Sequence, residues 1–272
     1  MFQRSRKSST VLAAAVLVVA AASGLAGQGR GAAQGGRGGA PPPPPPTGRA
    51  AARIELTGYW VALVTEDWRH RMFTPPKGDY DSVPLNPAGR GRADMWDPAK
   101  DEAAGEQCRA YGAAGIMRMP TRLHITWQDD TTLKVETDAG SQTRTFTFGP
   151  SQAPGGDWQG VSVASWDYPQ PPVPAQNFGR GRGGGLPPGG AMKVVTTRMR
   201  PGYVRKNGLP YGASAVLTEY FDRFDVPDGE SLLVVVQELV DPENFASPYW
   251  TSSHFRRQPD AAGWKPTACS AR

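Results

Sequence analysis

Short segments of alternating apolar and polar residues recur along the chain from residue 54 to residue 257. Alternation of this kind places successive side chains on opposite faces and is typical of antiparallel β-sheet with one buried face. A large set of such strands closes readily into a barrel, since closure removes the exposed edges. The sequence therefore predicts an all-β fold, an antiparallel barrel of about eight or more strands.

The first strand is expected to begin at residues 56–60, and the later ones lie at residues 122–127, 133–137, 144–148, 160–166, 193–200, 215–224, 232–240 and 251–257. One or two short helices are predicted before the second strand. Asp97 followed by Pro98 has the composition of a helix N-terminus, a capping side chain and then proline at the first helical position. This helix is expected to run to about Tyr111, and a shorter one is expected between residues 87 and 96.

The N-terminus has the pattern of a secretory signal peptide. Basic residues at 4, 6 and 7 precede the apolar run 11–22 and a small-residue region that ends near residue 27. The apolar run is too short to cross a bilayer, so residues 1–27 are predicted to be a cleaved leader and the mature chain to have no transmembrane segment. The expected location is the periplasm or the extracellular space.

Two low-complexity regions lie outside the strand pattern. Residues 28–53 are rich in Gly, Pro and Arg and are expected to form a disordered linker before the barrel domain at 54–272. A second region, 168–191, lies between two expected strands and is interpreted as a long surface loop. Its arginine–glycine run at 179–185 is of a kind that binds RNA, but the predicted export argues against that function.

The net charge of the chain does not indicate an acidic partner. The whole sequence carries +5, but residues 1–53 contain seven Lys or Arg and no acidic residue. The remainder has 30 − 7 = 23 basic against 25 acidic side chains, a formal charge of −2. We therefore expect no nucleic-acid partner on the ground of charge.

Cys108 and Cys269 are the only cysteines of the sequence. An even pair in a chain predicted for export to an oxidising compartment favours a disulfide, and the alternative of a reactive thiol pair lacks a C-x-x-C spacing. Such a bond would close a long loop and attach the C-terminal tail to the domain.

The segment Thr57-Gly58-Tyr59-Trp60 resembles the Gly-x-Trp opening of lipocalin and avidin-like barrels, in which this Trp packs under the closed end. Longer segments resemble a group of exported, largely uncharacterised proteins that are frequent in Acidobacteria and some Proteobacteria. These segments include 158–166, 218–223 and 241–249. The resemblance implies export and a lipocalin-like barrel, and it implies no particular activity.

Familiar catalytic motifs are missing from the sequence. It contains no Gly-x-Ser-x-Gly elbow and no phosphate-binding loop. His70, His124 and His254 are far apart, without a ligand partner at helical or hairpin spacing, so no metal and no cofactor are expected. The alternative of a metal site assembled from separate strands stays open. Carboxylates at 66–67 and 79–81 are candidates for a Ca²⁺-binding rim, but their spacing is unlike that of an EF-hand.

Polar residues on otherwise apolar strands are the remaining candidates. Glu219 shares a strand face with Leu217 and Phe221, and its burial requires a partner, for which Arg198 or Arg223 is expected if the pair is structural. If the site is catalytic instead, His124 and Glu219 are the candidate general acid and base. The candidate ligand-binding residues are Trp127, Arg198, Glu238, Trp250 and His254.

The sequence favours a protein that binds a small, mainly apolar ligand in or at its barrel. Two alternatives remain open. One is an enzyme, such as a hydratase, isomerase or hydrolase, that uses the same cavity. The other is an envelope interaction protein with a filled barrel and an exposed apolar patch.

Overall fold

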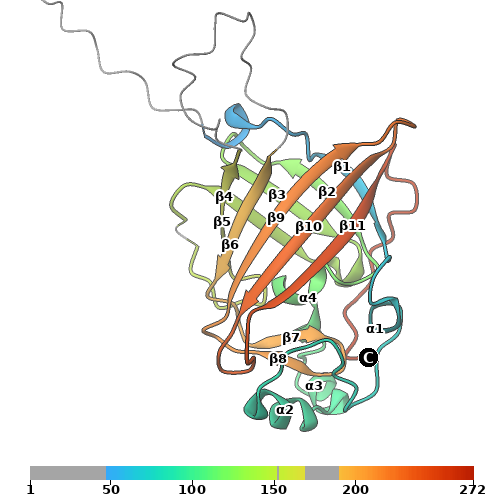
Figure 1. Ribbon diagram of the computed structural model, residues 1–272, viewed down its shortest axis with the longest axis vertical. Helices are drawn as coiled ribbons and strands as arrows, with labels where there is room; N and C mark the ends of the chain where they lie inside the picture. Colours follow the sequence, from blue (N-terminus) through green and yellow to red (C-terminus); the bar gives the residue numbers. More distant parts are fainter. Residues whose placement is uncertain (1–46, 152, 169–189) are drawn as a thin grey trace, which may run out of the picture. The chain divides into compact units, whose positions relative to one another are not determined.

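A computed structural model describes residues 47–151, 153–168 and 190–272. The predicted leader, nearly all of the predicted linker and most of the predicted loop at 168–191 lie outside these residues. The described residues all belong to one compact unit. Strands dominate it, and they form a closed barrel (Figure 1).

The barrel has the strand order β1-β11-β10-β9-β6-β5-β4-β3-β2, closed by pairing of β1 with both β2 and β11. Its strands are β1 (Gly58–Leu63), β2 (Arg122–Trp127), β3 (Thr132–Thr137), β4 (Thr143–Phe148), β5 (Val161–Asp167), β6 (Ala191–Thr197), β9 (Val216–Asp225), β10 (Ser231–Val240) and β11 (Tyr249–Gln258). The predicted all-β barrel is thus confirmed.

One pair departs from the predicted antiparallel arrangement. β4 and β5 are parallel, with Phe146 opposite Ser162. The connection between Phe148 and Val161 returns the chain to the end at which β4 begins, so β5 runs in the same direction as β4. Alternation within a strand reports its faces but not its direction, so the sequence pattern did not reveal this.

Small elements gather at one end of the barrel, the lower end in Figure 1. They are the strand pair β7 (Gly202–Arg205) and β8 (Leu209–Tyr211), the helices α1 (Trp68–Met72), α2 (Pro87–Asp94), α3 (Pro98–Ala103) and α4 (Ala113–Ile116), and the 3₁₀ turns η2 (Arg109–Tyr111) and η3 (Ala139–Ser141). The predicted short helix between residues 87 and 96 corresponds to α2, and Asp97 caps α3 as expected, accepting from the Ala99 amide at 3.1 Å.

The helix that begins at Pro98 is shorter than predicted. It ends at Ala103, and Gly105 follows with φ +70°, a left-handed conformation that favours glycine and terminates helices. The chain then makes only the 3₁₀ turn η2 before Gly112.

Side chains fill the interior of the barrel. The inward positions alternate along each strand, and the apolar side chains among them are 0% exposed at Trp60, Leu123, Ile125, Leu133, Val135, Phe146, Met192, Val194, Phe221, Leu233, Val235 and Phe255. They form one continuous core with Ile116, the last residue of α4, and with Met117, which follows it. The interior is therefore packed like an ordinary protein core.

Both ends of the barrel are covered. The entirely buried helix α4 lies at the lower end (Figure 1). The segment 47–57 covers the upper end, where the Trp166 indole donates to the Gly48 carbonyl at 2.7 Å and the Tyr168 hydroxyl donates to the Ala51 carbonyl at 2.6 Å. Trp60 is buried below this segment and donates to the Leu56 carbonyl at 2.9 Å.

Cys108 and Cys269 form the predicted disulfide, with 161 residues of sequence separation. The bond attaches the C-terminal tail to the lower end, where the Thr267 amide donates to the Asp138 carbonyl at 2.8 Å. Gly140 has φ +71° and lies directly against the Tyr111 ring, so a side chain there would be strained and would clash.

Within the described residues, no helix is long and apolar enough to cross a membrane.

Candidate functional site

Glu219 lies inside the barrel in a buried ion pair, and its partner is Arg144. The two guanidinium nitrogens of Arg144 donate to the two carboxylate oxygens at 3.0 and 2.5 Å, and both side chains are 0% exposed. Gln237 also donates to Glu219, at 3.1 Å. The predicted partners Arg198 and Arg223 were wrong, because Arg198 lies in the exposed turn after β6 and Arg223 bonds Asp225.

His124 lies on the outer face of β2, outside the barrel, whereas Glu219 points into its interior. Its ring stacks on Tyr59 with centroids 4.2 Å apart, and its Nδ1 is 3.1 Å from a Glu136 carboxylate oxygen. The strand pattern explains this position, since Leu123 and Ile125 point inward on either side. His124 and Glu219 therefore do not meet at one site, and the structure does not support them as an acid–base pair.

The other predicted ligand-binding residues are also dispersed. Trp127 packs near the upper end, 5.6 Å from the Phe148 ring centroid. Glu238 and His254 lie on the outer face, because the inward positions of their strands are Gln237 and Ser253. Trp250, 54% exposed, lies opposite Glu238 in the β10–β11 pairing. These residues, together with Arg198, do not line a common cavity.

A cavity of about 190 Å³ lies instead at the lower end, between α1, α4 and β7. We call it the cationic pocket, because four of its lining residues are Arg71, Arg118, Arg205 and Lys206 and none is acidic. His70 and Tyr111 also line it, and its apolar side consists of Met72, Phe73, Met119 and Val204. The barrel core ends above this pocket at α4, whose Gly115 forms part of the wall.

Arg71 is the most unusual residue of the cationic pocket. Only 2% of its side chain is exposed. Its Nε donates to the Arg118 carbonyl at 2.8 Å, but both terminal nitrogens lack a hydrogen-bond partner in the described part of the chain. The nearest carboxylate oxygen, from Glu66, is 3.5 Å from Nη1. A buried guanidinium with two unused donor groups is costly unless an acceptor joins it.

The burial of Arg71 also affects its protonation. Burial, followed by repulsion from the Arg118 charge, lowers the pKa of Arg71 to about 10. Glu66 and Asp67 offset part of this effect. The side chain nevertheless remains protonated at pH 7, so the pocket contains a buried positive charge.

The two other arginines differ in how well they are neutralised. Arg118 is well paired, since it donates to Asp67 at 2.6 Å and to the Ser252 carbonyl at 2.6 Å. Arg205, only 8% exposed, reaches the Asp81 carbonyl at 3.3 Å and has no carboxylate within 4.0 Å among the described residues. Arg71 and Arg205 together leave positive charge at the pocket that the protein itself does not fully balance.

Local backbone geometry fixes the pocket wall at α1. Asp67 has φ +48°, a left-handed conformation that aspartate tolerates better than most residues. Its carbonyl accepts from the amides of His70 and Arg71 at 2.8 and 3.1 Å, which starts the helix. Its carboxylate accepts from Arg118 and does not cap the helix. This ion pair holds the start of α1 against Arg118, which lines the pocket.

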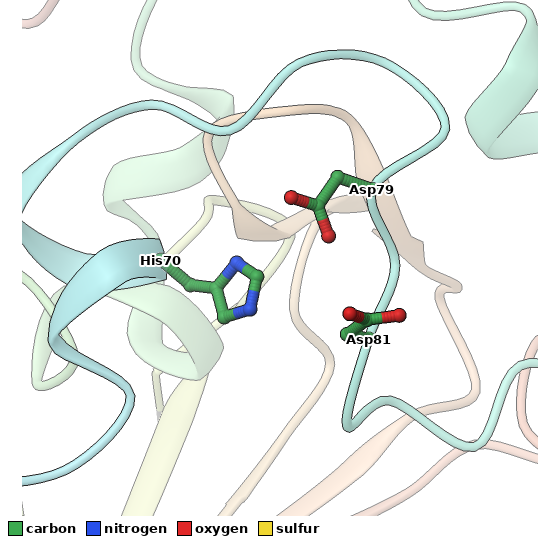
Figure 2. A group of neighbouring side chains, drawn as sticks. All are labelled: His70, Asp79 and Asp81. Atoms are coloured by element: carbon green, nitrogen blue, oxygen red, sulfur yellow. The ribbon is translucent and has the colours of Figure 1, made fainter.

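His70 connects the pocket to a group of potential metal ligands formed with Asp79 and Asp81 (Figure 2). One ligand atom from each lies within 4.8 Å of the others. A terminal nitrogen of Arg69 lies 3.2 Å from Asp79, 3.5 Å from Asp81 and 3.4 Å from His70 Nε2. The guanidinium thus already supplies the positive charge that a metal ion would bring. The group is well explained without a metal.

Burial, and then the positive charge of Arg205, lower the pKa of His70 below its usual 6.5, although the nearby Asp79 opposes the shift. The neutral ring is therefore favoured at pH 7. His70 contributes polarity to the pocket wall at this pH, and protonation below it would add a further positive charge.

The four cationic lining residues were not predicted from the sequence. They come from three separate stretches, around residues 71, 118 and 205–206, and each is surrounded by residues of mixed type. A single sequence shows no reason for these stretches to meet. The one available signal was the dense set of basic and apolar residues at 68–73.

No family model, curated protein or solved structure matches this chain.

Proposed function

We propose that this is an exported binding protein whose cationic pocket holds a small amphiphilic anion, with a phosphate or carboxylate group beside Arg71 and a short apolar part against Met72 and Met119. The observation that carries the proposal is the buried Arg71 guanidinium, whose terminal nitrogens make no hydrogen bond within the described residues and whose ion pair with Glu66 is shared with Arg118. A bidentate oxyanion is the chemical group that fits two parallel guanidinium donors.

The composition of the pocket narrows the ligand class. No carboxylate lines the pocket, although Glu66 lies 3.5 Å from Arg71, and Arg205 and Lys206 add positive charge to the lining. Met72, Phe73 and Val204 give the same pocket an apolar side. This combination favours an anion with an attached hydrocarbon group over inorganic phosphate alone.

The fold supports a site at the end of the barrel and not inside it. The interior is filled by buried side chains, and the two fully buried charged groups there, Arg144 and Glu219, are already paired with each other. The disulfide is typical of proteins in oxidising compartments, which agrees with the proposed export. The sequence predicted a mainly apolar ligand. We now propose an amphiphilic ligand that binds at the lower end of the barrel, outside its core.

Isothermal titration with hexyl phosphate tests the proposal, with hexanol as the uncharged match and inorganic phosphate as the match without a chain. The wild-type protein should bind hexyl phosphate most tightly. Arg71→Gln should weaken that binding roughly ten- to a hundredfold, as expected for loss of hydrogen bonds from a charged group.

Arg256→Gln is the matched control, because Arg256 is exposed on β11 and, among the residues that the structure describes, forms an ion pair only with Glu230, at 3.5 Å. It should bind hexyl phosphate like the wild type. Equal affinity for hexanol and hexyl phosphate, or an unchanged affinity in Arg71→Gln, would refute the proposed site.

A further inference from the structure

Exposed apolar side chains concentrate at one edge of the cationic pocket. Eight large apolar residues are substantially exposed in the described part of the chain, and three of them lie within residues 68–73. Trp68 is 60% exposed, Met72 51% and Phe73 68%. Met72 and Phe73 also line the pocket, so the apolar cluster and the pocket share an edge.

The geometry of α1 places these side chains together. Trp68 and Met72 are four residues apart in the helix and therefore lie on one face, and Phe73 follows directly. Arg71, three residues after Trp68 in the same helix, is buried, whereas Trp68 and Met72 are exposed. The exposed apolar edge therefore lies beside a buried positive charge.

Positive charge lies in the pocket beside the same edge. Arg205 and Lys206 line the pocket together with Arg71, whereas the 60% exposed Arg69 is paired with Asp79 and Asp81. Trp and Phe side chains beside Arg and Lys are typical of protein surfaces that rest in the headgroup region of an anionic bilayer. A soluble anion would use the pocket but would leave Trp68 without a role, since Trp68 does not line it.

We infer that the lower end of the barrel docks on an anionic phospholipid bilayer, with one lipid phosphate in the cationic pocket and Trp68, Met72 and Phe73 in the interfacial region of the membrane. The inference rests on the proposed function, because it assigns the source of the anion that the pocket binds. The occupant is a lipid headgroup presented by a membrane, and the contact with the acyl boundary comes from the exposed edge.

Vesicle flotation tests the inference, with phosphatidylcholine vesicles that contain or lack phosphatidylglycerol. The full chain should float with the anionic vesicles and not with the neutral ones. Trp68→Ala should reduce vesicle binding roughly tenfold, as expected for loss of one large apolar contact, and leave hexyl phosphate affinity unchanged. Arg71→Gln should reduce both.

Phe224→Ala is the matched control. Phe224 is 43% exposed near the end of β9, at the upper end of the barrel, so its loss should change neither vesicle nor hexyl phosphate binding. Lys206→Glu gives a second test of the charge at the pocket should Arg71→Gln fold poorly, and it should also reduce vesicle binding.

The outcomes separate the two proposals. Binding of hexyl phosphate without binding of anionic vesicles overturns the membrane inference and leaves the pocket proposal standing. Vesicle binding that persists in Trp68→Ala, Arg71→Gln and Lys206→Glu also overturns the inference, because it assigns the contact to other basic residues such as those at 28–53. Absence of hexyl phosphate binding overturns both.

Discussion

Two buried arginines of this protein, Arg144 and Arg71, differ in how completely they are paired. Arg144 has a complete partner in Glu219, inside the barrel. The terminal nitrogens of Arg71 make no hydrogen bond within the described residues, and its ion pair with Glu66, at 3.5 Å, is shared with Arg118 beside a cavity. Because an incompletely satisfied buried charge is costly, the first arrangement indicates a structural role and the second a binding role.

Replacing Arg144 with Met should destabilise the fold by roughly 3–5 kcal/mol, because Glu219 then remains buried without its partner. Denaturant unfolding measures this change. The double variant Arg144→Met/Glu219→Met should recover most of the loss, since no charge is left in the core.

Arg256→Met is the comparison for a surface pair, and it should cost less than about 1 kcal/mol. An equal effect of Arg144→Met and Arg256→Met on the free energy of unfolding would contradict the structural role of the buried pair.

His70 should make stability depend on pH. Its folded-state pKa is lowered by burial and by Arg205, so the unfolded state binds more protons as the pH falls below 6.5. The free energy of unfolding should therefore decrease as the pH falls through that region. His70→Gln should remove this part of the decrease, measured as the difference between wild type and variant at pH 7 and pH 5. A variant with the same pH dependence as the wild type would show that His70 does not carry the effect.

At the level of elements, the alternating pattern predicted the strands well. The observed β2 spans residues 122–127 as expected, and β10 differs by one residue at its start. Alternation works here because one face of every strand meets the same core. The pattern was less successful at β7 and β8, which are only four and three residues long and lie outside the barrel.

The faces of individual strands were harder to assign in strands that are apolar on both sides. In β10, Val234 and Val236 look like core residues, but Val235 and Gln237 are the buried ones. Glu238, a candidate ligand-binding residue, therefore lies on the outer face. The buried glutamine is stabilised by its bond to Glu219, which no local pattern indicates.

The disulfide joins two elements of the lower end, η2 and the C-terminal tail. Replacing Cys108 and Cys269 with Ser should lower the free energy of unfolding by up to roughly 5 kcal/mol, the chain-entropy value for a loop of this length. The Thr267 amide, which donates to Asp138 at 2.8 Å, should also exchange its hydrogen faster as the tail loosens. Unchanged stability together with unchanged exchange at Thr267 would show that the tail is held without the bond.

At the level of the whole molecule, the barrel serves as a filled scaffold and the candidate site lies on its lower end. The barrel and the disulfide follow from local signals, namely alternation and cysteine count. The cationic pocket depends on the meeting of α1, α4 and β7, which are distant in sequence. A single sequence contains no information on that meeting, so the pocket became evident only in three dimensions.

The position of the site at the lower end also explains why the candidate site residues predicted on the barrel strands do not lie together. Polar strand residues such as His124 and Glu238 face the exterior. There they contact neighbouring polar side chains, as His124 does with Glu136, or solvent. The unbalanced charge is instead on the small elements around α4. Function in β-barrels commonly lies on such connecting segments, because the scaffold holds them in place.

A crystal structure of the full chain with hexyl phosphate measures the position of the anion directly. We expect the phosphate oxygens within hydrogen-bond distance of the Arg71 terminal nitrogens, with the alkyl chain toward Met72 and Phe73. A phosphate bound inside the barrel beside Arg144, or on the outer wall beside His124, would contradict the assignment of the cationic pocket as the functional site.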